Sequence, residues 1–323
     1  MDKRSLPALQ CLSENQIEEL LRLTADFSRE RHHFRRDVLA GCRIGLLFDR
    51  PSTRTRLSFS IAAVELGATV FDLPLAAMQT TTGETKLDTA LVLSRYLDSV
   101  VIRSRSEDWW QALATAGVSA INGLDEKEHP TQALADLVTI KSLTGRLQNL
   151  RVLFLGEAGN ICRSFVLALS CFRGNDVILC GPNGYLFDEA EYRQLGDRYG
   201  RNGASFRQIG SLGLIRDSIN VVYVTRWRSI GEEKSDANWR QYFAPFQLNE
   251  TVWEKLCGAD TVLLHDLPAE RDAEVTSSLL DRQIESVLLQ ARNKIASAKA
   301  ALSWCLGSTT PRANTAKHRR ASR

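Results

Sequence analysis

The stretch IGLLFDRPSTRTRLSFSIAAVELG, residues 44–67, decides the fold class because it joins a strand to a helix through a short polar loop. Its first five residues, Ile44 to Phe48, form an apolar run that predicts a buried strand. Its second half predicts a helix, one face of which is marked by apolar residues at helical spacing: Leu57, Ile61 and Val64. The loop between them, PSTRTR over residues 51–56, is polar and basic. Strand, loop and helix together form the repeating unit of an α/β protein.

The same alternation continues along the chain. Short apolar runs predict strands at residues 69–73, 99–103, 150–156, 177–180, 221–225 and 261–265. Helical spacing predicts helices at residues 17–27, 85–96, 109–116, 131–144 and 284–306. Strands separated by helices of this length pair in parallel and are covered on both faces. We therefore predict an α/β fold with two doubly wound parallel sheets and a final helix that packs back on the first domain.

The length of 323 residues suits two domains, each with its own core. We place the first domain at residues 1–146, the second at 147–285 and the returning helix at 286–307. Residues 308–323 are rich in Ser, Thr and Arg and contain no acidic residue. This composition predicts a basic, solvated and disordered tail.

Composition excludes several classes of protein. Hydrophobic residues make up 44% and charged residues 24%, as in ordinary globular proteins. The apolar runs are far shorter than a membrane span of about 20 residues, and the first twenty residues lack the pattern of a signal peptide. The net charge of +3 arises from the basic tail, so the body carries no basic excess that would favour nucleic acid. We expect a cytoplasmic protein with no membrane or nucleic-acid partner.

The seven cysteines are scattered and never form a CxxC pair. Neither a zinc site nor a disulfide framework is therefore predicted, and we expect no metal.

The segment Ser52-Thr-Arg-Thr-Arg56 follows a predicted strand and begins a predicted helix. Helix N-termini offer free backbone N–H groups and a partial positive charge, and Ser, Thr and Arg side chains add donors for phosphate oxygens. The segment is therefore a candidate anion site. The alternative is an ordinary N-capping cluster followed by a solvated helical turn.

Other polar residues are expected to converge on this segment. Arg103 ends an apolar strand, where a side chain points into the crevice in which open α/β sheets bind ligands. His129-Pro-Thr-Gln132 lies at another predicted helix start. A histidine there can polarise a carbonyl, while the Gln132 amide can fix an amine or carbonyl group. A purely structural histidine is the alternative.

At this point the chain resembles the aspartate and ornithine carbamoyltransferases. The matching stretches, in the family's order, are FDRPSTRTRLSF, GETKLDTALVLSRY, VIR, EHPTQALADL, LFLGEAGN and HDLPAERDAEV. They extend from Phe48 to Val275 and so cover most of the chain. The resemblance implies a carbamoyl-phosphate-binding first domain, an acceptor-binding second domain and a homotrimer with shared active sites. It implies neither a metal nor an organic cofactor.

The resemblance also assigns residues to carbamoyl phosphate. By position, the phosphate would be held by Ser52, Thr53, Arg54, Thr55 and Arg103, and the carbamoyl group by His129, Gln132, the Leu267 carbonyl and Lys294. Lys294 stands where the family carries an arginine. Gln79 would reach a neighbouring subunit's site, although Thr82 stands where the aspartate enzymes have a lysine. Arg54, Arg103, His129 and Gln132 would stabilise the oxyanion and the departing phosphate.

The acceptor-binding residues follow neither branch of the family. Asn160 matches an asparagine that contacts the amino-acid end of ornithine, whereas Arg226 resembles the arginine of the aspartate enzymes. Ser229 and Ile230 return to the ornithine pattern. Trp227 and Arg228 are bulky and would shrink an acceptor pocket. The loop is thus a hybrid of the two patterns.

Asp266 is the most unusual residue, because ornithine enzymes have a cysteine and aspartate enzymes a proline at this place. A carboxylate there can hold a cationic amine or accept its proton. Alternatively, Asp266 only caps a turn before Pro268.

We therefore predict a carbamoyltransferase that acts on the side-chain amine of a diamino acid, with ornithine as the default acceptor and 2,3-diaminopropionate as a competitor. Three alternatives stay open: an aspartate carbamoyltransferase, a catalytically silent regulatory paralogue, and a dinucleotide-binding oxidoreductase. The last has little support, because GEAGN at residues 156–160 does not complete a GxGxxG motif.

Overall fold

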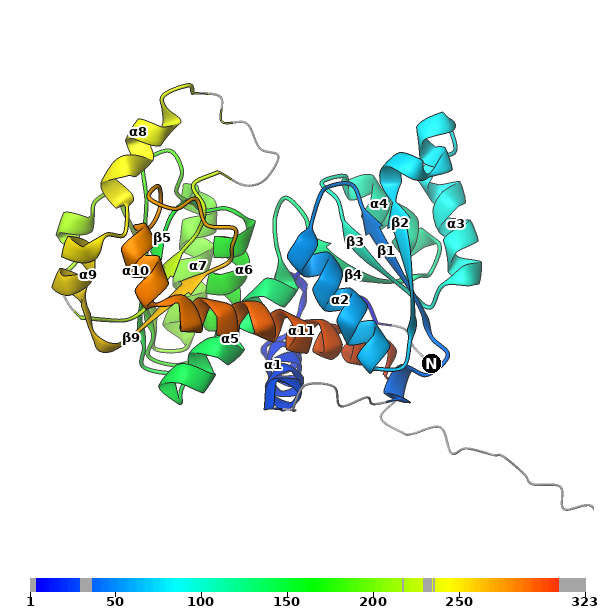
Figure 1. Ribbon diagram of the computed structural model, residues 1–323, viewed down its shortest axis with the longest axis horizontal. Helices are drawn as coiled ribbons and strands as arrows, with labels where there is room; N and C mark the ends of the chain where they lie inside the picture. The colour runs from blue at the N-terminus through cyan, green and yellow to red at the C-terminus, as the bar shows by residue number, and fades with distance from the viewer. Residues whose placement is uncertain (1–3, 30–36, 217, 229–233, 235, 308–323) are drawn as a thin grey trace, which may run out of the picture.

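The computed structural model describes residues 4–29, 37–216, 218–228, 234 and 236–307. It contains two parallel sheets, seen side by side in Figure 1. The first sheet has the order β2-β1-β3-β4, and the second has the order β7-β6-β5-β8-β9. Their strands are β1 Arg43–Phe48, β2 Thr69–Pro74, β3 Ser99–Arg103, β4 Ser119–Leu124, β5 Arg151–Leu155, β6 Asp176–Cys180, β7 Ser205–Ile209, β8 Ile219–Val224 and β9 Cys257–His265.

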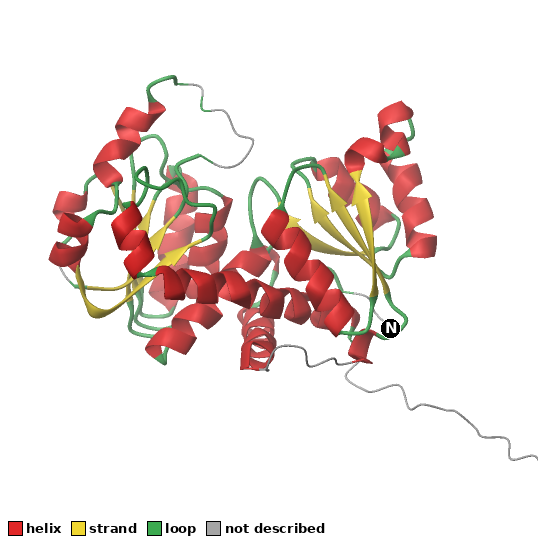
Figure 2. Ribbon diagram, in the orientation of Figure 1, coloured by secondary structure: helices red, strands yellow, loops and turns green. Residues whose placement is uncertain are grey.

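Helices cover the faces of both sheets (Figure 2). The α-helices are α1 Glu14–Arg29, α2 Thr53–Glu65, α3 Lys86–Tyr96, α4 Glu107–Thr115, α5 Pro130–Thr144, α6 Asn160–Leu169, α7 Glu189–Arg201, α8 Trp239–Phe243, α9 Glu250–Leu256, α10 Ser277–Arg282 and α11 Ile284–Leu306. Short 3₁₀ helices lie at Leu9–Cys11, Asp37–Leu39, Leu75–Ala77, Gln79–Thr82, Leu212–Leu214 and Ala244–Phe246. The predicted α/β fold class with two parallel sheets is confirmed.

Helix α11 connects the two halves of the molecule. It runs from β9 of the second sheet along α5 to α1, α2 and β4 (Figure 1). Its middle carries small residues, among them Ala296, Ala298 and Ala300, that are buried and allow close helix packing. The predicted return of the last helix to the first domain is therefore confirmed. The domain limits at 146 and 285 stay predictions, and the basic tail lies outside the described residues.

Each sheet has one topological switch point, where the chain connections from two neighbouring strands run in opposite directions. Ligands of open α/β sheets bind at such points. In the first sheet this point lies between β1 and β3, where Phe48 pairs with Arg103. In the second sheet it lies between β5 and β8, where Leu155 pairs with Val224. The loops that follow these four strands carry most of the candidate site residues.

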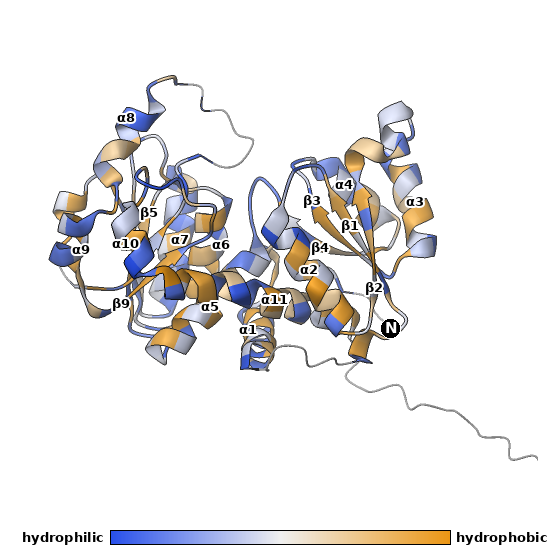
Figure 3. Cartoon of the chain, in the orientation of Figure 1, coloured by the Kyte–Doolittle hydropathy of each residue, from blue (hydrophilic) through white to orange (hydrophobic). Residues whose placement is uncertain are grey.

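Helix α2 carries apolar residues on its exposed face as well as on the face that packs on the core. The buried residues of α2 are Thr55, Ser58, Phe59, Ala62 and Ala63. The apolar residues that mark its other face, Leu57, Ile61 and Val64, are 54%, 38% and 59% exposed. Figure 3 shows hydrophobic and hydrophilic residues mixed along α2.

Within the described residues, no helix is long and apolar enough to cross a bilayer. The same residues contain no group of three or more His, Cys, Asp or Glu side chains arranged to hold a metal ion.

Candidate active site

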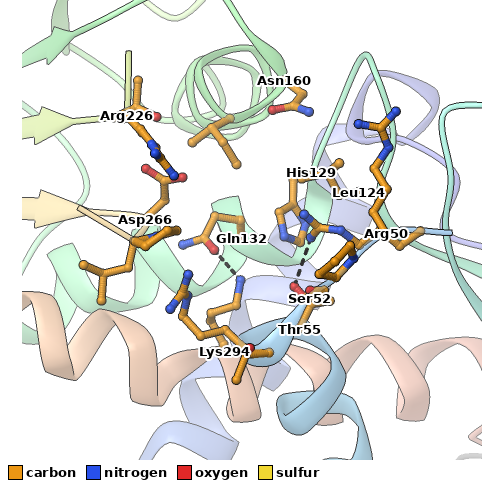
Figure 4. A pocket seen from close by; sticks show the side chains of 18 of the residues that line it. Arg50, Ser52, Thr55, Leu124, His129, Gln132, Asn160, Arg226, Asp266 and Lys294 are labelled. Atoms are coloured by element: carbon orange, nitrogen blue, oxygen red, sulfur yellow. Dashed lines mark hydrogen bonds between the residues drawn. The ribbon is translucent and has the colours of Figure 1, made fainter. Parts of the chain in front are cut away.

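A cavity of about 360 Å³ lies between the two sheets, at the carboxyl ends of their strands. Figure 4 shows side chains from both halves of the molecule pointing into it. It is lined by Arg50, Pro51, Ser52, Thr53, Arg54, Thr55, Arg103, Arg105, Leu124, His129, Gln132, Asn160, Ile161, Thr225, Arg226, Asp266, Leu267, Pro268 and Lys294. Most of the predicted residues of the first and second domains are thus brought together in one place.

The first wall is the N-terminus of α2. Ser52 is its N-cap residue, but the Ser52 hydroxyl makes no capping hydrogen bond to the helix. Arg103 Nη1 donates to Thr55 Oγ1 at 3.4 Å, which ties the end of β3 to the first turn of α2. The Ser52 hydroxyl therefore does not act as an ordinary helix cap. The first turn of α2 lines the cavity, so its backbone N–H groups are available to a ligand there.

This wall is strongly cationic. Burial lowers the pKa of Arg103 to about 10, with Arg50 and Arg54 acting in the same direction and Asp49 opposing them. Burial also lowers the pKa of Arg54, opposed by Asp266. Both guanidinium groups remain charged near neutral pH. Because like charges are held close together here, an entering dianion relieves repulsion as well as gaining hydrogen bonds.

The floor of the cavity comes from α5 and α11. His129 is the N-cap residue of α5, its backbone N–H donates to Ser164 Oγ at 2.7 Å, and Pro130 begins the helix. Burial, followed by Lys294 and Arg103, keeps the pKa of His129 well below its usual value, so its ring is neutral. His129 Nδ1 has no hydrogen-bond partner among the described residues.

Gln132 and Lys294 meet at this floor. Lys294 Nζ donates to Gln132 Oε1, as the dashed line in Figure 4 marks. Gln132 Nε2 donates to Asp136 Oδ1 at 2.7 Å, deeper in the protein. Lys294 comes from α11, the last helix in the chain, and so lies far from Gln132 in the sequence.

The opposite wall belongs to the second sheet. Gly156 follows β5 with a φ of 146°, and a Cβ there would lie 2.5 Å from Thr225 Cγ2, so the close approach of the two loops requires glycine. Asn160 begins α6, and its Nδ2 donates to the Asp125 carbonyl at 2.7 Å. Arg226 follows β8, and its Nη2 lies 3.5 Å from Glu270 Oε2.

Asp266 is the one carboxylate among the residues that line the cavity. Its side chain is 16% exposed, and Oδ1 has no hydrogen-bond partner in the described part of the chain. Burial raises the pKa of Asp266, opposed by His265, Thr225 and Lys294. Asp266 therefore carries an available oxygen that is poorly solvated.

Neighbouring residues hold the loop that carries Asp266. The Leu267 N–H donates to His265 Nδ1 at 2.9 Å, so the ring proton resides on Nε2, which lies 3.1 Å from Glu274 Oε1. Leu267 itself has a φ of 53°, an uncommon conformation for a leucine. A fixed backbone at Leu267 suits its predicted use of a main-chain carbonyl.

Some predicted residues are not in this cavity. Gln79 begins an exposed 3₁₀ helix and accepts a hydrogen bond from Thr82 Oγ1 at 2.8 Å. The expectation that Trp227 and Arg228 shrink the pocket is wrong: Trp227 is buried with its ring 5.7 Å from that of Phe243, and the Arg228 guanidinium lies 5.8 Å from the Trp239 ring. Neither lines the cavity. Ser229 and Ile230 lie outside the described residues.

Sequence reasoning also missed several residues of the cavity wall. They are Arg50, Arg105, Leu124, Ile161, Thr225 and Pro268. Arg50 adjoins the PSTRTR segment and Arg105 follows Arg103 by two residues, so proximity to a candidate motif was an available signal. The apolar Leu124 and Ile161 carried no such signal.

The fold and the site define a two-sheet α/β protein with a cavity between its halves whose charged residues are mainly cationic. Comparison with known families identifies it further. Residues 4–142 match the family described as "Aspartate/ornithine carbamoyltransferase, carbamoyl-P binding domain", and residues 148–305 match "Aspartate/ornithine carbamoyltransferase, Asp/Orn binding domain". The chain belongs to the aspartate/ornithine carbamoyltransferase family, and it is a carbamoyltransferase.

Individual relatives agree with this assignment. The chain is 35% identical over 293 residues to an ornithine carbamoyltransferase of Anoxybacillus flavithermus, which covers 90% of this chain and 92% of the relative. The crystal structure of ornithine carbamoyltransferase from Gloeobacter violaceus superposes with a TM-score of 0.80 at 30% identity, covering 94% and 99% of the two chains. The ornithine carbamoyltransferase from Pyrococcus furiosus gives a TM-score of 0.86 at 31% identity, covering 94% and 97%.

Proposed function

We propose that this carbamoyltransferase transfers the carbamoyl group of carbamoyl phosphate to the side-chain amine of a diamino acid. Ornithine is the default acceptor, and 2,3-diaminopropionate is its competitor. The observation that carries the proposal is Asp266, a lone carboxylate in a cavity whose other charged residues are all cationic. A cationic amine is the natural partner of its free oxygen.

The cationic wall suits the phosphate end of carbamoyl phosphate. The first turn of α2 supplies Ser52, Thr53 and Thr55, and the charges come from Arg54 and Arg103. Arginine matches phosphate oxygens in pairs, and a helix N-terminus adds backbone donors. These groups bind the dianion and stabilise it further as it departs.

The carbamoyl end then lies over the floor of the cavity. A neutral His129 donates to the carbonyl oxygen without the cost of a charged ring, and Lys294 adds a positive charge there. The Gln132 side chain and the Leu267 carbonyl accept from the carbamoyl nitrogen. In this arrangement the carbonyl is polarised before the amine attacks, and the oxyanion that develops as the C–N bond forms is stabilised by the same donors.

The reaction needs a neutral amine. Asp266 holds the incoming ammonium group and takes one proton from it, and the nitrogen lone pair then attacks the carbamoyl carbon. A C–N bond forms, the C–O bond to phosphate breaks, and the second amine proton leaves with the phosphate or to water. Asn160 and Arg226 would hold the amino-acid end of the acceptor, with Ser229 and Ile230 retained as further candidates.

Aspartate is the second candidate acceptor. Arg226 lines the cavity and resembles the arginine of the aspartate branch, which favours a carboxylate ligand. Against it, a dicarboxylate acceptor would bring a negative charge close to Asp266. The relatives reported above are named ornithine carbamoyltransferases, which also supports a diamino acid.

An acceptor panel tests this proposal. With carbamoyl phosphate we expect turnover of ornithine or 2,3-diaminopropionate at least about 100-fold above that of aspartate. This ratio corresponds to about 2.7 kcal/mol between an acceptor whose side-chain amine pairs with Asp266 and an acceptor whose side-chain carboxylate is repelled by it. The panel adds 2,4-diaminobutyrate, putrescine and lysine, and mass spectrometry detects the carbamoylated product. Turnover of aspartate alone would overturn the diamino acid assignment.

We also propose a homotrimer in which Gln79 reaches the site of a neighbouring subunit. Large exposed apolar side chains lie on α2, on the edge strand β2 and on α3: Leu57, Ile61, Val64, Phe71, Leu87, Leu91, Val92 and Tyr96. Exposed apolar side chains of this kind are typical of a protein interface. A second copy of this chain is the proposed occupant, because Gln79, in the segment between β2 and α3, is exposed and does not line the cavity of its own chain.

Changing Leu57 to Glu should dissociate this assembly. Leu57 is 54% exposed in the single chain, so a charge there does not disturb the core, but it would be buried between subunits. Light scattering coupled to size exclusion should report a monomer near 36.1 kDa. Leu288→Glu is the matched control, because Leu288 is 50% exposed on α11. Identical masses for both variants would contradict the proposed interface.

A further inference from the structure

A buried polar network continues below the floor of the cavity. Asp136 is fully buried on α5 and does not line the cavity. Three side chains donate to its carboxylate: Gln132 Nε2 at 2.7 Å, Gln290 Nε2 at 2.6 Å and Tyr223 Oη at 3.1 Å. The donors come from α5, α11 and β8, so the carboxylate joins both halves of the molecule.

The network fixes the direction of the Gln132 amide. An ionised carboxylate only accepts hydrogen bonds, so Gln132 must turn its Nε2 toward Asp136. Gln132 Oε1 then faces the cavity floor, where Lys294 Nζ donates to it. Reversing the amide would place two donors against each other at Lys294.

Lys294 is almost fully buried, so its charge needs compensation. The charged and titratable groups that face it are Asp136 and His129 of α5, Asp266 after β9, Arg103 of β3 and Arg54 of α2. Asp136 is the first of the groups that favour the protonated amine. An arginine at this place would keep its charge at any working pH, whereas a lysine does not.

From this geometry we infer that Asp136 is a positioning residue that keeps Lys294 protonated and Gln132 oriented, and that loss of the Lys294 proton sets the upper pH limit of carbamoyl-group binding. The inference rests on the proposed function, in which Lys294 and Gln132 contact the carbamoyl group. It assigns a role to Asp136 although this residue touches no substrate.

The direction of the pH effect follows from burial. Burial lowers the pKa of Lys294 to about 8, with Asp136 opposing the decrease. The amine is therefore charged below that pH and increasingly neutral above it. Burial raises the pKa of Asp136. Removing the Asp136 charge takes away the support for the Lys294 proton, so the upper limit should move to lower pH.

Binding of phosphonoacetamide, a stable analogue with an amide and a phosphonate, measures this limit without any acceptor. Between pH 7 and 9 we expect the wild-type Kd to rise about tenfold relative to that of Lys294→Arg, because arginine stays charged. Comparing the variants at each pH cancels titration of the ligand itself. Asp136→Asn, which keeps Oδ1 as an acceptor, should lower the pH of half-maximal weakening by about one unit.

Lys299→Arg is the matched control. Lys299 lies on the same helix, is equally buried and pairs with Glu65 at 2.6 Å, but does not line the cavity. It should reproduce the wild-type profile. Parallel weakening of wild type and Lys294→Arg, or an unchanged midpoint in Asp136→Asn, would overturn the inference. If Lys294→Arg does not fold, Asp136→Asn alone decides. A protein that binds the analogue as expected but turns over no acceptor would instead contradict the proposed diamino acid function.

Discussion

Replacing Arg54 by Met is expected to lower kcat/KM for carbamoyl phosphate by about 10³-fold, on the order of 4 kcal/mol of transition-state stabilisation. Arg54 lies in the first turn of α2 and lines the cavity. Methionine preserves much of the side-chain length but removes every donor. The variant lacks a charged partner for the bound phosphate, and this loss weakens the transition state, in which the phosphate departs, more than the bound state. KM should therefore rise and kcat should fall. Phosphate release with carbamoyl phosphate and the best acceptor measures the change.

Arg56→Met separates this effect from a general loss of charge on α2. Arg56 lies two residues further along the helix, where it pairs with Asp72 and stacks over the Phe48 ring at 4.9 Å. It does not line the cavity. We expect activity within about threefold of wild type, since a partly exposed ion pair contributes little. Equal losses in the two variants would argue against a specific phosphate contact at Arg54.

Much of the fold could be predicted because its strands are continuous apolar runs. The strand β3 has the predicted bounds, Ser99–Arg103, and helix α11 the predicted bounds, Ile284–Leu306. The strand β4 was not predicted, because Asn122 and Gly123 interrupt its apolar pattern. Asn122 is nevertheless fully buried, and its Nδ2 donates to the Pro7 carbonyl at 2.7 Å and to Asp125 Oδ2 at 2.9 Å. Pro7 lies 115 positions away in the sequence, so this partner leaves no local signal.

The candidate site could be predicted where its residues belong to short motifs. Ser52 to Thr55, His129 and Gln132 all face the cavity as expected. Asp136 could not be identified in this way, because within the helical pattern of α5 an acidic residue predicts a solvated position. Only the tertiary structure shows that Gln290, 154 positions later in the chain, meets it. Helical spacing likewise could not reveal that Leu57 and Val64 are exposed, since apolar periodicity is the same for a core and an interface.

Replacing Asp266 by Asn is expected to lower kcat by about 100-fold, or about 2.7 kcal/mol, while the KM for carbamoyl phosphate stays within about threefold. Asparagine has nearly the same shape and can still accept from Thr225, but it neither pairs with an ammonium group nor takes its proton. Because burial raises the pKa of Asp266, the wild-type carboxylate is lost at a higher pH than that of an exposed aspartate. The acidic limb of the kcat profile should therefore flatten in the variant.

Asp272→Asn is the control within the same loop. Asp272 accepts from the Ser277 N–H and hydroxyl, both at 2.8 Å, and has a φ of 63°, which asparagine tolerates. It does not line the cavity, so we expect its kcat to match wild type. If Asp266 served only to cap the turn before Pro268, Asp266→Asn would lower the melting temperature and leave kcat and its acidic limb intact. A loss of kcat at unchanged stability would therefore place the Asp266 carboxylate in contact with the reacting amine.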